Sequence, residues 1–226
     1  MSKPRCIRAG DTWFITCGIT GRHHLLRPDA DGVIQQIYWY ATAVMAARHG
    51  IQVHAVQILS THTHEVLTDV LGRMPDFLRD RNRLLALALQ VHRKWSDNVF
   101  PRKQASYVLL YGPQAVMGEI GYTIANVVKA GLVAHPSEWP GVTVLANEIG
   151  VRKVEVSRPT VYFSAKNPNW PEVATLEITM PQVLIDTYGD DAKARLVRSV
   201  DAAVEGARKK AIAPIFGSLE VLFTPV

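Results

Sequence analysis

The 226-residue chain has only two cysteines, Cys6 and Cys17, and no run of about twenty uninterrupted apolar residues. Two cysteines cannot build a disulfide framework, and their spacing fits no zinc finger, so we expect reduced structural thiols. The absence of a long apolar run excludes a membrane-spanning helix. Residues 1–8 carry charges with no apolar stretch behind them, which is not typical of a secretory signal. We therefore expect a cytoplasmic protein.

What the chain does contain is typical of a globular protein. Hydrophobic residues make up 48% and charged residues 20% of the sequence, and its length suits one large domain or a core with an extension. The net charge is +5 and the isoelectric point is near 9.3. A basic balance permits a polyanionic partner but does not establish one.

Apolar periodicity and turn residues predict an alternating order of elements along the first two thirds of the chain. Strands are expected over residues 12–17, 53–59, 61–68 and 106–111, and helices over residues 31–49, 75–95 and 113–131. Gly50 and Gly131 provide C-terminal stops, and Pro113 can open the last of these helices. The order βαββαβα is that of a ferredoxin-like α+β layer with an antiparallel sheet.

The sequence changes character after about Trp139. Residues 147–153 are polar, residues 167–171 form a turn cluster, residues 174–180 alternate like a strand, and residues 190–210 have the pattern of a charged amphipathic helix. We interpret residues 1–145 as a core and residues 146–226 as a C-terminal α/β extension packed against it. Gripping DNA, capping the core and dimerisation all remain open roles for the extension.

His62-Thr63-His64 follows the apolar run of residues 53–59. Side chains alternate across a strand, so the two imidazoles project from one face while Thr63 points away. That arrangement suits two ligands of one metal ion, although a short His pair is easily imitated by ordinary histidines. His54 and the pair His23-His24 have no supporting spacing, and we treat them as ordinary residues.

Tyr122 and Asn126 are spaced i, i+4 and would share one face of a helix. The helix would thereby present a phenol beside an amide oxygen. An isolated tyrosine most often packs in a core, and Tyr107 and Tyr111 are rival candidates whose strand-like setting favours a core role.

The tyrosine segment reads Tyr-Thr-Ile-Ala-Asn-Val-Val-Lys-Ala-Gly-Leu-Val over residues 122–133, and residues 135–140 read His-Pro-Ser-Glu-Trp-Pro. With the His pair upstream, these segments resemble the single-tyrosine HUH transposases, and among them the REP-associated tyrosine transposases, whose helix has the pattern Tyr-x-x-x-Asn-Pro-Val-x-Ala-Gly-Leu-Val. The resemblance covers roughly residues 12–145.

The resemblance implies an HUH endonuclease core that cleaves and transfers single-stranded DNA, with Tyr122 as the nucleophile of a 5′-phosphotyrosine intermediate. It further implies a divalent metal ion, Mg²⁺ or Mn²⁺, held by His62, His64 and Asn126, with imidazoles favouring Mn²⁺. The expected partner is single-stranded DNA, typically with a hairpin beside the cleavage site. Relatives act as monomers or as homodimers, and the expected location is the cytoplasm, at the nucleoid.

The sequence departs from the family pattern at several positions, including residues 58–61 before the His pair. Thr63 replaces the central hydrophobe, Glu65 stands where an apolar residue is expected, and Val127 replaces the proline after Asn126. Thr63 and Glu65 place two polar groups on the strand face opposite the histidines, which requires hydrogen bonds or water. These departures keep two alternatives open: a domesticated, weakly active or inactive DNA-binding or regulatory protein, and a metal-dependent phosphoesterase that uses water.

Basic residues gather on the predicted second helix and in the loop after it. Arg73, Arg79, Arg81 and Arg83 cluster near its start, and His92-Arg93-Lys94-Trp95 ends it. Basic groups with an interleaved tryptophan suit phosphate neutralisation and base stacking, whereas the plain alternative is a solvated helix face with Trp95 in the core. The residues that we assign to DNA binding are Arg79, Arg83, Arg93, Lys94, Arg102, Lys103 and Lys129. For Lys129, an interaction with the helix dipole is an equally simple explanation.

Overall fold

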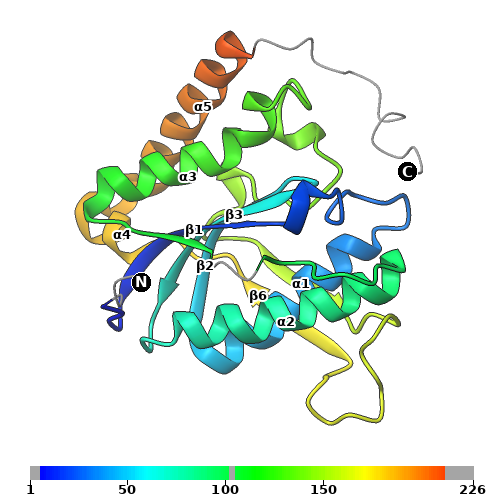
Figure 1. Ribbon diagram of the computed structural model, residues 1–226. Helices are drawn as coiled ribbons and strands as arrows, with labels where there is room; N and C mark the ends of the chain where they lie inside the picture. The colour runs from blue at the N-terminus through cyan, green and yellow to red at the C-terminus, as the bar shows by residue number, and fades with distance from the viewer. Residues whose placement is uncertain (1–5, 102–104, 212–226) are drawn as a thin grey trace.

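The computed structural model describes residues 6–101 and 105–211 and is built around a four-stranded antiparallel sheet (Figure 1). The strands are β1 (Asp11–Gly18), β2 (Ile51–Ile58), β3 (His62–Asp69) and β4 (Ser106–Leu109). Their order in the sheet is β2-β3-β1-β4, and all three neighbouring pairs are antiparallel. This is the ferredoxin-like arrangement that the sequence predicts, with β3 in an inner position.

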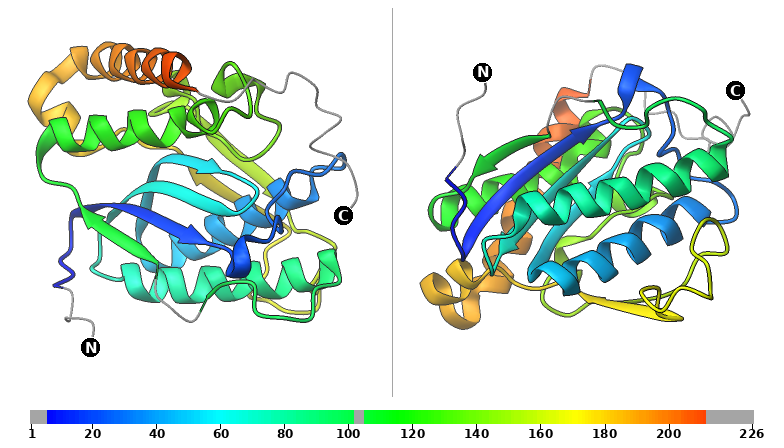
Figure 2. Two further views of the ribbon diagram at one scale, coloured as in Figure 1. Left: turned by 45° about the horizontal axis from the view of Figure 1, so that its top comes forward. Right: turned by 60° about the horizontal axis from the view of Figure 1, so that its bottom comes forward.

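Helices cover both faces of the sheet. They are α1 (Val33–His49), α2 (Met74–Arg93) and α3 (Gly112–Lys129). Figures 1 and 2 show α1 and α2 together on one face and α3 on the other. The predicted order βαββαβα is confirmed, and most boundaries agree within about two residues. Gly50 ends α1 in the left-handed conformation, with φ of 68° and its N–H bonded to the carbonyl of Ala46.

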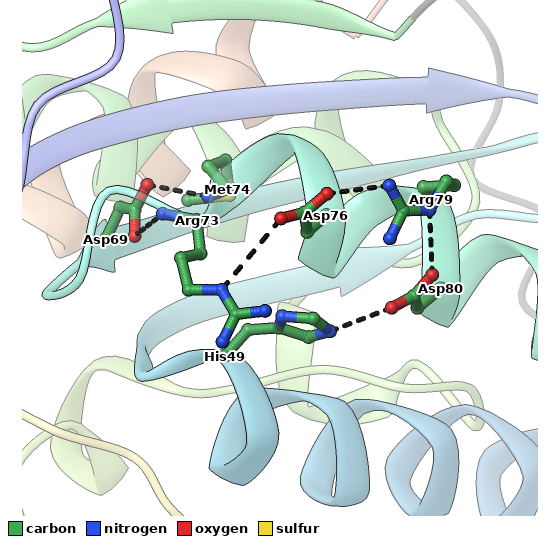
Figure 3. A network of polar contacts seen from close by, with 7 residues as sticks. All are labelled: His49, Asp69, Arg73, Met74, Asp76, Arg79 and Asp80. Carbon is green, nitrogen blue, oxygen red and sulfur yellow. Dashed lines mark hydrogen bonds and ion pairs between the residues drawn. The ribbon is translucent and has the colours of Figure 1, made fainter.

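The start of α2 is tied to the end of β3 by a buried carboxylate (Figure 3). Asp69 accepts hydrogen bonds from the backbone N–H groups of Arg73 and Met74, both at 2.7 Å. These two N–H groups have no acceptor inside the helix, and the carboxylate satisfies them. Its negative charge also interacts favourably with the positive N-terminal end of the helix dipole. His49 at the end of α1 contacts Asp80 of α2 at 3.0 Å, which joins the two helices on this face.

Residues after the core add a second sheet and two helices. β5 (Lys153–Ser157) and β6 (Val173–Glu177) form an antiparallel pair beside α1, followed by α4 (Gln182–Tyr188) and α5 (Ala192–Lys210), which packs along α3. The sequence predicts β6 and α5 but misses β5 and α4. Ile178 bridges to Val53 of β2, and Thr179 donates its N–H to the Val53 carbonyl at 2.9 Å. A division near residue 146 stays a prediction.

Short 3-10 turns link these elements at Thr20–Arg22, Pro136–Glu138, Ala146–Glu148 and Gly189–Asp191. Cys17 is buried, Cys6 is exposed, and both are free. Across the described ranges, no helix combines the length and the apolar character needed to cross a membrane.

Candidate active site

β3 presents His62 and His64 to the face of the sheet that α3 covers. In the register with β1, His62 lies opposite Gly18 and His64 opposite Thr16. The two imidazole rings lie 4.8 Å apart between centroids, and the His64 ring stacks on Phe14 at 5.6 Å. The strand alternation that the sequence predicts therefore places both histidines on one side.

Each histidine is oriented by a threonine hydroxyl at one ring nitrogen. Thr61 Oγ1 lies 2.9 Å from His62 Nδ1, and Thr16 Oγ1 lies 3.3 Å from His64 Nδ1. The opposite nitrogen of His64, Nε2, is buried and has no partner among the described residues. A buried nitrogen without a partner is costly unless a ligand satisfies it, so Nε2 has the character of a metal-binding atom.

The surroundings keep both imidazoles neutral. Burial, together with smaller contributions from the nearby His62 and Lys129, lowers the pKa of His64 to about 4. Burial also lowers the pKa of His62, with a contribution from the positive charge of Arg22. A neutral imidazole has the lone pair that a metal ion requires, so the pair is ready to bind metal at neutral pH.

Helix α3 places Tyr122 directly beside the histidines. The Tyr122 ring meets His64 edge to face at 5.5 Å and Phe14 at 5.8 Å, and the side chain is 37% exposed. Asn126 lies one turn later and is buried. Lys129 Nζ lies 4.7 Å from the centre of the Tyr122 ring. Spacings of four and seven residues align all three side chains on one helix face.

These groups line one open cleft of about 550 Å³. Its lining residues are Thr16, Gly18, Ile19, Arg22, Thr61, His62, His64, Tyr122, Asn126, Lys129 and Ala130. All four residues assigned to chemistry are thus together, although the strand and the helix that carry them are far apart in the sequence. Arg22 was missed by sequence reasoning, since nothing in the loop after β1 distinguishes it until the fold places it at the cleft.

The residues present fit a divalent metal ion. Within the ranges that the structure describes, no three His, Cys, Asp or Glu side chains form a metal-binding group. The donor set that the resemblance implies, His62, His64 and the amide oxygen of Asn126, lines the cleft, and the unpartnered Nε2 of His64 supports it. Three protein ligands leave coordination positions for phosphate or water.

On the other face of β3, Glu65 is fully buried and fully bonded. Its carboxylate accepts hydrogen bonds from Tyr38 Oη of α1 at 2.5 Å and from Arg81 Nη1 of α2 at 2.7 Å. The Arg81 guanidinium also lies over the Phe77 ring at 4.9 Å. Glu65, one of the two polar residues that depart from the family pattern on this face, therefore has its buried carboxylate satisfied by hydrogen bonds. Including Arg81 in a DNA-facing basic cluster was wrong, because this side chain is buried in the core.

The other predicted DNA-binding residues on α2 lie on the face of the sheet opposite Tyr122. Arg79 is paired with Asp76 at 2.6 Å and Asp80 at 2.9 Å, and Arg93 donates to the backbone carbonyls of Leu25 and Arg27. Arg83 and Lys94 are exposed. Arg102 and Lys103 lie outside the described residues, and among the described members of the set only Lys129 lines the cleft. DNA contacts by these residues stay a prediction.

The rival side chains have other settings. Tyr107 packs edge to face on Trp13 at 6.4 Å, and neither tyrosine lines the cleft. Tyr111 is 78% exposed just before α3, so the core role expected for it was wrong. His54 is buried with Nδ1 2.9 Å from the Thr179 carbonyl and Nε2 2.8 Å from Thr68 Oγ1. With both nitrogens bonded, His54 is a structural histidine.

Comparisons with known proteins bear on the fold. No family model matches the chain, and no curated protein sequence matches it. A solved structure of a REP-associated tyrosine transposase bound to a REP hairpin superposes with a TM-score of 0.52 and 19% identity, covering 62% of this chain and 81% of that one. A candidate transposase from Deinococcus radiodurans, at 20% identity over 56% of this chain and 97% of that one, has a TM-score of 0.35, which is too low to indicate the same fold. The resemblance found in the sequence is therefore confirmed at the level of fold: this chain has the fold of a REP-associated tyrosine transposase.

Proposed function

We propose that this protein is a metal-dependent endonuclease and transposase that cleaves and joins single-stranded DNA through Tyr122. The observation that carries the proposal is the cleft itself, where an exposed tyrosine lies 5.5 Å from a histidine ring whose buried Nε2 has no partner among the described residues. A nucleophile beside a set of metal ligands is the arrangement that phosphoryl transfer to tyrosine requires.

The proposed reaction is a transesterification. The Tyr122 oxygen forms a bond to the scissile phosphorus while the bond from phosphorus to the 3′ oxygen breaks. The phenol proton passes to solvent, and the departing 3′ oxygen takes up a proton to become a hydroxyl. The 5′-phosphotyrosine link retains the phosphodiester energy, so attack by another 3′-hydroxyl reverses the step and joins the strands without ATP.

Residues of the cleft have distinct parts in this scheme. His62, His64 and Asn126 would hold Mg²⁺ or Mn²⁺, which when bound supplies Lewis-acid stabilisation of charge on the phosphate. Thr16 and Thr61 orient the two imidazoles. Two cations line the cleft, Lys129 on α3 and Arg22 in the turn after β1, and they favour a phosphate group between them.

The proposed partner is single-stranded DNA with a hairpin beside the cleaved bond. The REP-associated transposase of the same fold was solved bound to a REP hairpin. A net charge of +5 favours a nucleic acid, and phosphate contacts would position a hairpin stem. A monomer and a homodimer are both compatible with a cleft formed by one chain.

The test is a search for a covalent adduct. The protein is incubated with labelled single-stranded oligonucleotides, including hairpin-bearing sequences from beside its own gene, together with Mn²⁺ or Mg²⁺, and run on a denaturing gel. We expect an adduct that is lost in Tyr122→Phe, lost with chelator and lost in His64→Ala. Tyr111→Phe is the matched control, since it removes an exposed phenol outside the cleft and should leave the adduct unchanged.

Two other outcomes would contradict the proposal. Cleavage with repeated turnover and no adduct would identify water as the nucleophile, as in a metal-dependent phosphoesterase. Tight binding without cleavage on every hairpin would favour a domesticated DNA-binding protein, whose function Tyr122→Phe leaves intact.

A further inference from the structure

We infer that the groove between α3 and α5 binds the unpaired DNA strand that continues from the active-site cleft. This inference rests on the proposed function and specifies where the strand lies. Figures 1 and 2 show α5 running along the outer side of α3, away from the sheet. None of the basic residues of α5 was assigned to DNA binding on sequence grounds.

The groove is large enough for a ligand. Its volume is about 680 Å³, within the roughly 300–1,000 Å³ that small-molecule sites occupy. The two helices approach closely at Gly121, where an added Cβ would lie 3.1 Å from the Ala203 Cβ. At Gly118 and Gly206, which line the groove, an added Cβ would meet nothing within 4 Å. The opening is therefore space that the packing of the helices leaves free.

The groove adjoins the catalytic cleft. Tyr122, Lys129 and Ala130 line both cavities, so the two meet at the exposed edge of α3. A strand whose phosphate lies at the Tyr122 oxygen has to leave the cleft along the surface. The groove provides a path that begins at the nucleophile.

The charge and surface of the groove suit a single strand. Lys129 and Lys210 line it, and none of the described residues that line it is acidic. Tyr122 contributes an aromatic ring to the lining, and Ala125 and Ala207 contribute small apolar side chains. A cationic groove with an aromatic ring is the arrangement by which proteins hold single strands without reading sequence. A duplex cannot present its base faces, so the groove should favour unpaired DNA.

The test measures binding separately from cleavage. Fluorescence anisotropy with labelled dT20 compares Gly206→Leu, which fills the groove, and Lys210→Ala, which removes a cation, with the unmodified protein. The matched controls are Ala202→Leu, at an exposed position of α5 outside the groove, and Lys209→Ala, whose side chain pairs with Glu205 at 3.4 Å. Thermal melting checks that every variant is folded.

We expect Gly206→Leu to weaken dT20 binding about tenfold without changing its salt dependence. Lys210→Ala should weaken binding several-fold and reduce the slope of log K against log salt by about 0.7, the value for one phosphate contact to a single strand. The controls should change affinity less than twofold, and a 20-base-pair duplex should show no difference between the variants.

Unchanged dT20 binding in both groove variants would overturn the inference. A change in oligomeric state on sedimentation of Gly206→Leu, with DNA affinity intact, would also overturn it and identify the groove as an interface between copies. The adduct assay keeps the two proposals apart. Groove-dependent binding without an adduct in the unmodified protein refutes only the proposed cleavage, whereas normal adducts with groove-independent binding refute only this inference.

Discussion

The two faces of β3 carry polar groups in opposite states. On the α3 face, His62 and His64 line an open cleft, and the buried Nε2 of His64 has no partner among the described residues. On the face toward α1 and α2, Glu65 has no exposed surface, and both of its oxygens are bonded. Neighbouring residues on one strand thus have different roles.

The comparison distinguishes polar groups that stabilise the fold from polar groups that are available to a ligand. A buried carboxylate is tolerated when a cation and a hydroxyl satisfy it, and the arrangement then joins two helices to the central strand. A buried nitrogen without a partner contributes nothing to such a network and is retained where a ligand can use it. Because the histidines also line an open cleft, the α3 face is the candidate binding face, whereas Glu65 on the opposite face belongs to the core.

We expect the largest loss of stability when one charge is removed on the face of β3 toward α1 and α2. Arg81→Met leaves the Glu65 carboxylate buried without its ion partner, and we expect a loss of about 3–5 kcal/mol in the free energy of unfolding, measured by urea denaturation. Arg83→Met, two residues away and exposed, should change stability by less than about 0.5 kcal/mol. The double variant Glu65→Leu/Arg81→Met should recover most of the loss; a loss as large as that of the single variant would contradict the role of the ion pair.

The pH dependence of stability tests His54, whose two ring nitrogens are both bonded, in contrast to the histidines of the cleft. Burial lowers the pKa of His54 to about 4, below its ordinary value near 6.5. Between these pH values the unfolded chain therefore binds more protons than the folded protein. The free energy of unfolding is highest above about pH 6.5 and decreases by about 3 kcal/mol as the pH falls toward 4.

Urea denaturation at several pH values tests that loss. His64 contributes in the same direction, so the informative comparison is with His54→Gln, whose stability should fall less steeply over this range. His24→Gln, at an exposed histidine, should keep the steep dependence. Equal slopes for His54→Gln and the unmodified protein would show that His54 does not titrate in this way.

The open face can be tested through the hydroxyls that orient its histidines. Thr61→Val removes the partner of His62 Nδ1, and we expect Mn²⁺ affinity to fall about 10-fold, at the lower end of the range for such supporting contacts. Isothermal titration calorimetry measures this directly. Thr63→Val is the matched control, because its hydroxyl lies on the opposite face and should not affect the metal. Equal Mn²⁺ affinities in the two variants would argue against a supporting role for Thr61.

The smallest effect is expected for the stability of the control variant Thr63→Val. Thr63 Oγ1 is buried and has no partner among the described residues, so it is an unsatisfied polar group on the face toward α1 and α2. Replacing the hydroxyl with a methyl group of similar shape should raise the free energy of unfolding by about 1 kcal/mol. A loss of stability in Thr63→Val would reveal a partner for this hydroxyl, such as a buried water.

The elements of the core are well predicted from the sequence because they depend on local pattern. The helix that ends at Gly50 and the strand that carries His62 and His64 follow from apolar periodicity and turn residues. β5 and α4 are missed because both are too short to show a clear apolar period in the sequence, and packing against the core stabilises them. The α2 arginines look alike in the sequence, yet Arg81 is buried while Arg83 is exposed.

What the sequence by itself determined is therefore local: the order of strands and helices, the common face of the two histidines, and the alignment of Tyr122 with Asn126. These follow from periods of two and 3.6 residues, which need no long-range contact. Only the tertiary structure decided that β3 lies inside the sheet, that Tyr38 and Arg81 meet Glu65, and that Arg22 reaches the cleft. Those contacts join residues far apart in the chain, and only the packing of helices on a twisted sheet selects which distant side chains meet.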